Sequence, residues 1–197
     1  MKKFLPWIVI GGALLLIGFW YINVKNGAIT VSQAVNKEWG NVESAYQRRN
    51  DLIGNLVKTV RGAADFEKST LEAVISARSK ATSITIDPTN ITPEQFEQFS
   101  QAQSGVSSAL SRLLVTVERY PELKANQNFL KLQDELASTE NQILTARTRF
   151  NEKVESYNNY VLKIPRKLIL SEYKEKSMFK SVEGAEKPVD VEFDFGN

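Results

Sequence analysis

The hydrophobic positions of this chain follow two patterns, a continuous run near the start and a spaced repeat through the rest. The run extends from Phe4 to Ile22 without a charged residue, and it follows Lys2 and Lys3. At about 1.5 Å per residue, it is close in length to the ~30 Å hydrocarbon core of a bilayer. This run therefore predicts a single transmembrane helix that anchors the protein.

A cleaved signal peptide is the competing interpretation, because it also begins with basic residues and an apolar stretch. The end of the run argues against cleavage, since it lacks small residues in the A-x-A arrangement and carries aromatic residues typical of the membrane interface. Two glycines on one face could let two spans approach, although ordinary membrane-helix glycines are the simpler interpretation. The residues expected to define the anchor are Trp7, Gly11, Gly18, Trp20 and Tyr21.

Beyond the run, apolar residues recur every three or four positions from Gly27 to Pro165, which predicts amphipathic helices. A first helix carries its apolar stripe from Val31 to Ala63, and Gly54 interrupts this stripe without ending it. A second, shorter helix is expected from Glu67 to about Ala81. In both helices the apolar residues form one face, and this face must be buried against another helix.

The segment from Thr82 to Pro93 breaks the helical pattern and ends in a helix-start signal. Thr92 is the expected N-cap, Pro93 suits the first helical position, and Gln95 completes a capping box. These residues predict the beginning of a third helix at about position 93.

The third helix carries its stripe from Phe96 to Tyr120, and the fourth from the region of Leu123 to Phe129 as far as Ile164. Four amphipathic helices with short connections must bury their stripes on one another, so we predict an all-α fold, an elongated antiparallel four-helix bundle. An up-down bundle places the first and fourth helices side by side. The spacing also allows coiled-coil packing, so self-association through the same stripes is an alternative.

The C-terminal part follows a different pattern. Residues 166–173 still contain apolar side chains, whereas residues 174–187 are charged and loop-like. The last residues alternate between apolar Val189, Val191, Phe193 and Phe195 and acidic neighbours, which predicts an extended strand. Such a tail either lies on its own bundle or adds to the sheet edge of a partner protein. The chain is thus divided into an anchor (1–24, span about 4–22), a bundle (25–165) and a C-terminal segment (166–197).

Composition removes several classes of function. The 197 residues include no His and no Cys, which excludes imidazole catalysis, thiolate nucleophiles, Cys/His zinc sites and disulfides. The chain has 25 basic and 23 acidic residues, and beyond residue 24 their numbers are equal, so the body lacks the charge expected of a nucleic-acid-binding protein. Lys2 and Lys3 favour a cytoplasmic N-terminus, although Lys25 weakens the asymmetry.

The remaining catalytic possibilities have no supporting motif. Four serines lie between residues 104 and 111, but none belongs to a Gly-x-Ser-x-Gly or Ser-x-x-Lys motif. Glu94 and Glu97 have helical spacing without the Glu-x-x-His elements of di-metal bundles, and a helix N-terminus accounts for both. We therefore predict no catalytic residue, no cofactor and no metal site.

Several polar residues fall on or beside the apolar stripes. Arg49 lies on the stripe of the first helix, and antiparallel pairing with the fourth helix allows it to face Glu140. A buried polar layer that fixes helix register is the main interpretation, and a ligand or partner site in the same layer is the alternative. The residues of this candidate layer are Tyr46, Arg48, Arg49, Asp51, Asn55, Thr139, Glu140, Asn141, Arg147 and Asn151.

Several short blocks of the chain together resemble the LemA family. These blocks are Tyr46–Ile53, Asn55–Val57, Tyr120–Ala125, Leu136–Asn141, Ala146–Arg147 and Phe150–Asn151. The resemblance implies a bacterial, membrane-anchored protein with a four-helix-bundle body, and it carries no catalytic activity with it. The chain departs from the family pattern at Gly54, where relatives usually have a proline, and at Phe66, where a His is common. A metal or acid/base role for that His cannot apply here.

The anchor, the neutral body and the missing catalytic motifs favour a non-enzymatic scaffold or adaptor of the cell envelope. The expected partners are the membrane and either envelope proteins or further copies of the chain, and the resemblance implies proteins found alongside membrane metalloproteases. We expect a single-pass protein of the cytoplasmic membrane with its body outside the cytoplasm. The alternatives are a rod that transmits a signal into the span, and an enzyme that uses the polar layer.

Overall fold

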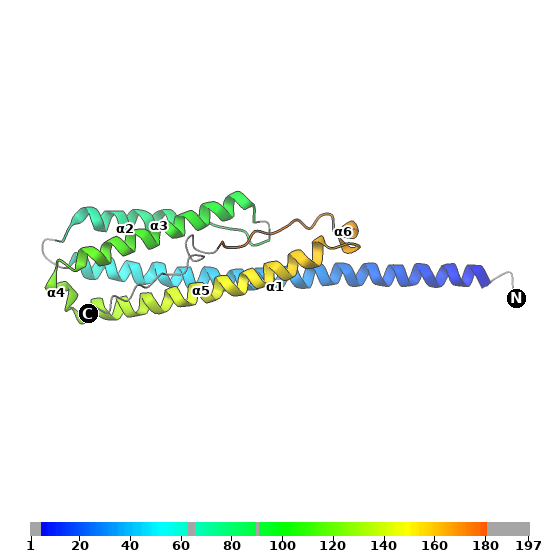
Figure 1. Cartoon of the computed structure of the whole chain (residues 1–197), viewed down its shortest axis with the longest axis horizontal. Coiled ribbons are helices and arrows are strands. Elements are labelled where there is room, and N and C mark those ends of the chain that lie inside the picture. Colours follow the sequence, from blue (N-terminus) through cyan, green and yellow to red (C-terminus); the bar gives the residue numbers. More distant parts are fainter. Residues whose placement is uncertain (1–4, 63–65, 90, 181–197) are drawn as a thin grey trace, which may run out of the picture.

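The computed structural model describes residues 5–62, 66–89 and 91–180, and this part of the chain is all-α, as predicted, with no strand (Figure 1). Its elements are α1 (Leu5–Arg61), α2 (Lys68–Thr82), α3 (Pro93–Val117), α4 (Pro121–Lys124), α5 (Gln127–Leu162) and α6 (Arg166–Ile169).

Helix α1 contains both the apolar run and the first helix of the body, without a break between them. Its N-terminal part projects beyond the other helices (Figure 1), and apolar side chains such as Trp7 and Leu15 are exposed there. Gly11 and Gly18 face open space in this part. Length and composition make it the one candidate span in the described part of the chain, and the anchor residues Trp20 and Tyr21 lie exposed near its end.

The body is built on the pairing of α1 with α5, which run side by side in opposite directions (Figure 1). The shorter hairpin of α2 and α3 covers the half of this pair that lies farther from the apolar run. Figure 1 shows an elongated helical bundle, compatible with the predicted arrangement of four main helices.

Two hydrophobic clusters fill the bundle, one after the other along its length. The distal core lies far from the apolar run and is mostly aliphatic; its members include Leu52, Ile53, Leu56, Val60, Leu71, Val74, Val106, Leu110, Leu113, Phe129 and Leu136. The proximal core lies nearer the apolar run and is rich in aromatic residues; its members include Val35, Trp39, Tyr46, Phe96, Phe99, Ile143, Phe150, Val154, Tyr157, Leu170 and Phe179.

In the distal half, Arg78 of α2 links its helix to α1. Its Nε donates a hydrogen bond of 2.8 Å to the carbonyl oxygen of Asn50. Gly54 of α1 provides the space for this contact, because a Cβ at position 54 would lie 3.4 Å from Arg78 Nη2. Gly54 therefore acts as a packing position, and α1 continues through it without ending.

In the proximal half, Trp39 is fully buried at the centre of an aromatic cluster. Its ring centroid lies 5.3 Å from Phe99, 5.4 Å from Phe150 and 6.3 Å from Phe179. Phe179 comes from the C-terminal segment, which the sequence indicated only as charged and loop-like.

Residues 170–180, which we call the strap, run without helix along the proximal half of the bundle. Asn151 and Asn158 of α5 each hold the strap through two hydrogen bonds. The Asn151 amide bonds to both the N–H and the carbonyl of Phe179, and the Asn158 amide does the same at Lys176, each at 2.9 Å. Tyr157 Oη adds a bond of 3.1 Å to the carbonyl of Lys174. The tail with alternating residues lies outside the described residues.

The helix boundaries confirm one prediction and correct another. Thr92 and Gln95 form the predicted capping box, with Pro93 opening α3. The fourth helix, however, is preceded by the separate short helix α4 and ends at Leu162. Ile164, which the stripe placed in the buried face, is therefore 78% exposed.

Candidate functional site

Arg49 is the most deeply buried charged side chain in the described part of the body, with 1% of its surface exposed. Its Nη1 donates hydrogen bonds of 3.0 Å to Glu140 Oε1 of α5 and to Ser107 Oγ of α3. Its Nη2 donates to the side-chain oxygen of Gln103 at 2.5 Å and to the carbonyl of the same residue at 3.3 Å. One guanidinium thus connects α1, α3 and α5 at the boundary between the two cores.

Two other predicted members of the polar layer are buried in the same part of the bundle, and one of them contacts the ion pair. The Tyr46 ring lies 4.9 Å from the Arg49 guanidinium carbon, which is a cation–π distance. Burial raises the pKa of the Tyr46 hydroxyl above its usual value, and the charges of Arg147 and Arg49 act in the opposite direction. Thr139 is fully buried and donates its hydroxyl to the carbonyl of Glu135, within its own helix.

Two further predicted residues belong instead to the contact with the strap. Arg147 donates from Nη2 to the carbonyl of Lys180 at 3.0 Å, and its guanidinium lies 4.7 Å from the Phe179 ring. Asn151 holds the backbone of Phe179. Both side chains therefore position the C-terminal segment rather than the Arg49 ion pair.

An open cavity of about 750 Å³ lies beside Arg49, between α3, α5 and the strap. Serines 100, 104 and 107 of α3 line one side of it, and Glu140 and Arg147 of α5 line the other. The two terminal nitrogens of Arg49 already donate four hydrogen bonds, so the donor that is left is its buried Nε, which has no partner among the described residues. The side chains available to a ligand here are the serine hydroxyls, the exposed edges of Glu140 and Arg147, and the polar groups of Glu97, Gln101 and Lys180.

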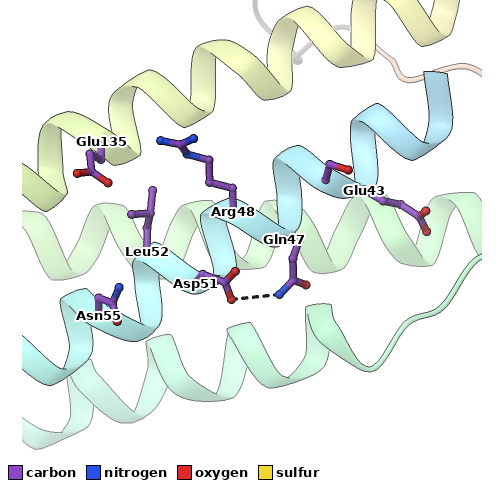
Figure 2. A pocket seen from close by; sticks show the side chains of 8 residues that line it. Glu43, Gln47, Arg48, Asp51, Leu52, Asn55 and Glu135 are labelled. Atoms are coloured by element: carbon purple, nitrogen blue, oxygen red, sulfur yellow. Dashed lines mark hydrogen bonds between the residues drawn. The ribbon is translucent and has the colours of Figure 1, made fainter. Parts of the chain in front are cut away.

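The remaining predicted residues face outward on the α1–α5 pair. Arg48, Asp51 and Asn55 of α1 and Asn141 of α5 are exposed. Figure 2 shows Arg48 extending toward α5, and Gln47 donating a hydrogen bond of 3.1 Å to Asp51. The structure does not bring these side chains to Arg49.

These outward residues line a continuous depression that we call the outer groove. It consists of two adjoining pockets of about 620 and 680 Å³, both lined by Ser44 and Arg48, and no residue of α2 or α3 contributes to either. The polar and charged side chains of the outer groove are Asn41, Glu43, Ser44, Gln47, Arg48, Asp51, Asn55, Glu135, Ser138, Asn141, Gln142, Thr145 and Arg149.

Sequence reasoning missed several residues that form these contacts. Gln103 was visible as a polar residue on the apolar stripe of the third helix, and this position could have marked it as a partner of Arg49. Asn158 lies seven residues, or about two turns, after Asn151, so the two side chains lie on the same face of the helix. Phe179 offered a weaker signal, a single large aromatic residue within a charged segment.

The arrangement offers few groups for chemistry. Among the described residues, no three acidic side chains lie close enough together to hold a metal ion. The open shape and polar lining of the outer groove suit contact with another macromolecule better than enclosure of a small molecule, because ligand sites are usually concave and apolar.

Comparisons with known proteins complete the description of this site. The sequence model of the LemA family matches residues 38–193, a range that includes the Arg49 ion pair and the outer groove. The chain is 24% identical to Protein LemA of Metamycoplasma hominis, over 75% of this chain and 65% of that protein. It is 26% identical to magnetosome protein MamQ 2 of Paramagnetospirillum magneticum and 25% identical to magnetosome protein MamQ of Magnetospirillum gryphiswaldense, each over 71% of this chain and 58% of the relative. The chain thus spans about two thirds or less of the length of these relatives.

Proposed function

We propose, from the premise that this chain belongs to the LemA family, that it is a membrane-anchored helical adaptor or scaffold without enzymatic activity of its own. The chain is a membrane-associated protein of the LemA type, with one apolar helix that continues into a helical bundle. The relatives described above, Protein LemA and the magnetosome proteins MamQ, do not carry the names of enzymes. The function that fits such a protein is to hold other proteins at the membrane.

The observation that carries this proposal is the exposure of the polar residues in the outer groove. Arg48, Asp51, Asn55 and Asn141 belong to the sequence blocks that resemble the family, yet they are exposed. Exposed charges and amides contribute little to the stability of a fold. They are available for hydrogen bonds and ion pairs with a protein that lies along α1 and α5.

The charges of the outer groove indicate the chemistry of this partner. Acidic Glu43, Asp51 and Glu135 alternate with basic Arg48 and Arg149. A surface of mixed sign recognises a partner with a matching pattern of charges, and this gives specificity more than affinity. We infer that the partner is either a folded envelope protein or a second copy of this chain.

The buried Arg49 ion pair has a supporting role in this proposal. It joins three helices at the boundary between the two cores, and a buried polar contact of this kind favours one register of the helices over others. A fixed register keeps the α1 and α5 sides of the outer groove aligned. Arg49 therefore positions the surface, while the exposed residues contact the partner.

Photo-crosslinking in intact cells tests the adaptor proposal. A photoreactive amino acid replaces Gln142 in the outer groove of the full-length protein, and in a matched control it replaces Arg112, which is exposed on α3. We expect discrete adducts from position 142 that are absent from position 112. Arg48→Ala together with Asp51→Ala should reduce these adducts at least fivefold without changing the amount of protein in the membrane.

The identity of the crosslinked protein distinguishes an adaptor from a self-assembling scaffold. Adducts with one recurring second protein support an adaptor, and adducts only between copies of the chain support a self-assembling scaffold. The same adducts from both positions, or none from either, would overturn the assignment of the outer groove as the partner surface.

One observation favours a second function, the transmission of a signal through the span. Helix α1 runs without interruption from the apolar run into the body, so a rotation or tilt of the body reaches the span directly. For both functions we propose a location in the cytoplasmic membrane, with the N-terminus inside and the body outside the cytoplasm. A four-residue flexible insertion between the span and the body would abolish signalling but leave crosslinking from the outer groove intact.

A further inference from the structure

The turn after α5 exposes the two most exposed large apolar side chains of the described body. Ile164 is 78% exposed and Leu168 is 77% exposed. They lie in residues 163–171, which we call the foot; it includes the short helix α6 (Figure 1) and the first two residues of the strap. Isolated exposed apolar residues are common, but two of them on one ordered turn indicate a surface that meets an apolar environment.

The foot is fixed to the body by its opposite side. Leu170 is 1% exposed in the proximal core, and Ile169 packs against the same cluster. The Arg166 guanidinium stacks on the Tyr160 ring at 4.1 Å, and Tyr160 Oη donates a hydrogen bond of 3.2 Å to the carbonyl of Val24. These contacts hold the foot against α1 at the level of Val24.

A second contact ties the strap to the same level of α1. Lys25 forms an ion pair with Glu172, directly after the foot, and its ammonium lies 5.8 Å from the Tyr21 ring and 6.0 Å from the Tyr173 ring. The hydrogen bond from Lys25 lowers the pKa of the Glu172 carboxyl, which keeps the pair charged. Two independent contacts thus place the foot beside residues 24 and 25.

This level coincides with the surface of the membrane. The apolar run ends at Ile22, so Val24 and Lys25 lie about 3 to 5 Å beyond it at ~1.5 Å per residue. The headgroup regions add about 5 to 8 Å to each side of the hydrocarbon core. The foot therefore lies at the depth of the lipid headgroups when α1 spans the bilayer.

The charges of the foot match this environment. Residues 163–171 contain Lys163, Arg166 and Lys167 and no acidic residue, and the nearest following acid, Glu172, is already paired with Lys25. Basic residues beside exposed apolar ones are typical of segments that lie in the interface of a bilayer with anionic lipids.

We propose that the foot is a membrane-contact site that inserts Ile164 and Leu168 among the lipid headgroups and places Lys163 and Lys167 against the phosphates of anionic lipids. The proposal rests on the membrane anchor and is independent of the partner of the outer groove. The span crosses the bilayer and the foot contacts the leaflet on the side of the body, and together they set the inclination of the body over the membrane.

The depth of the foot in a bilayer tests this proposal directly. The chain contains no cysteine, so Leu168→Cys in the full-length protein gives one site for a nitroxide spin label. Leu144→Cys is the matched control. Leu144 is also an exposed leucine, with 61% of its surface accessible, but it lies on α5 farther from the apolar run. Each labelled protein is placed in nanodiscs of phosphatidylcholine with one quarter phosphatidylglycerol, and the accessibility of the label to oxygen and to a water-soluble nickel complex is measured.

We expect the label at position 168 to be at least fivefold less accessible to the nickel complex than the label at position 144. Equal accessibility at the two positions would overturn the proposal. Spin–spin broadening at position 168 that disappears on dilution with unlabelled protein would also overturn it, because it would show that a second copy covers the foot.

The lipid composition tests the role of the basic residues. In nanodiscs of phosphatidylcholine alone, the protection at position 168 should decrease at least twofold. The double substitution Lys163→Gln and Lys167→Gln should produce the same decrease in the anionic nanodiscs, with the circular dichroism spectrum unchanged. Protection that is the same in both lipids and in the substituted protein would overturn the assignment of anionic lipid as the ligand.

Discussion

The two halves of the body cover the same pair of long helices in different ways. In the distal half, the hairpin of α2 and α3 packs on α1 and α5, and aliphatic side chains such as Leu56, Val74 and Leu113 fill the space between them. In the proximal half, the strap and the first turns of α3 cover the same pair, and Phe179 of the strap joins Phe96 and Phe99 of α3 around Trp39.

The difference shows how an extended segment can complete a core that helices cover only in part. A helix presents a buried side chain at every third or fourth position, whereas the strap contributes few, with Leu170 and Phe179 buried among its residues. Aromatic residues compensate because each buries a large area and contacts several neighbouring rings, as Phe179 contacts Trp39, Phe96 and Phe150. The proximal half therefore depends on a few large contacts, and the distal half on many small ones.

Removing one ring should affect the proximal half most strongly. Phe150→Ala deletes a ring that lies 5.4 Å from Trp39 and 5.6 Å from Phe179, and we expect it to lower the free energy of unfolding by about 3 to 5 kcal/mol. Leu113→Ala, in the distal core, should cost about 2 to 4 kcal/mol. Denaturant unfolding of the full-length protein in detergent measures both, and a larger loss for Leu113→Ala would contradict the contrast between the two halves.

The next largest effect is expected at the boundary between the halves. Glu140→Leu removes an acceptor of the buried Arg49, and we expect a loss of about 1 to 3 kcal/mol, because the Glu140 side chain is 43% exposed and water partly replaces it. Adding Arg49→Leu should recover part of this loss. The control Glu135→Leu, in the outer groove, should change the stability by less than about 0.5 kcal/mol. Equal losses for Glu140→Leu and Glu135→Leu would show that the ion pair does not join the halves.

Weakening the hydrogen bonds that hold the strap should expose the proximal half to protease without affecting the distal half. Asn151→Ala removes two hydrogen bonds to Phe179, worth about 1 to 2 kcal/mol together, so the rate of trypsin cleavage after Lys176 should rise about tenfold. Cleavage after Arg78 and Lys80 in the distal half should not change. Asn159→Ala, at an exposed neighbouring position, is the control, and faster cleavage in both halves would indicate that the strap also stabilises α2 and α3.

The smallest expected change in stability comes from replacing either of two glycines of α1 in the proximal half with alanine. Gly40 faces open space, so Gly40→Ala should raise the free energy of unfolding by up to about 1 kcal/mol. Gly27→Ala would place a Cβ 2.0 Å from Tyr160 Oη and should instead lower the stability. Thermal unfolding of the two variants, followed by circular dichroism, measures the difference in sign, and stabilisation by both would show that Tyr160 moves aside freely.

The helices of the body were predictable because their signals are local and repeated. Thr92, Pro93 and Gln95 fix the start of α3 within four residues of sequence. The apolar stripes predicted which faces are buried, and the polar residue Arg49 on one stripe pointed to a contact with Glu140. These features follow from periodicity and capping, which a single sequence records directly.

The strap was not predictable in the same way, because its position depends on contacts between distant residues. Nothing periodic marks residues 170–180, and Phe179 is buried only because Asn151 and the rings around Trp39 receive it. The end of the fourth helix was misjudged for a similar reason. Ile164 continues the apolar stripe, but the chain leaves the helix after Leu162, and Ile164 lies exposed in the turn before α6.

The unbroken course of α1 has a consequence for the direction in which the body faces. A helix turns by about 100° with each residue, so the number of residues between the span and Arg48 sets the angle about the helix axis between the outer groove and any one face of the span. A partner that contacts both the span and the outer groove therefore meets the two surfaces at a fixed angle. One alanine inserted after Ile22 would rotate the outer groove by about 100° relative to the span, while the contacts among the side chains of the groove stayed the same.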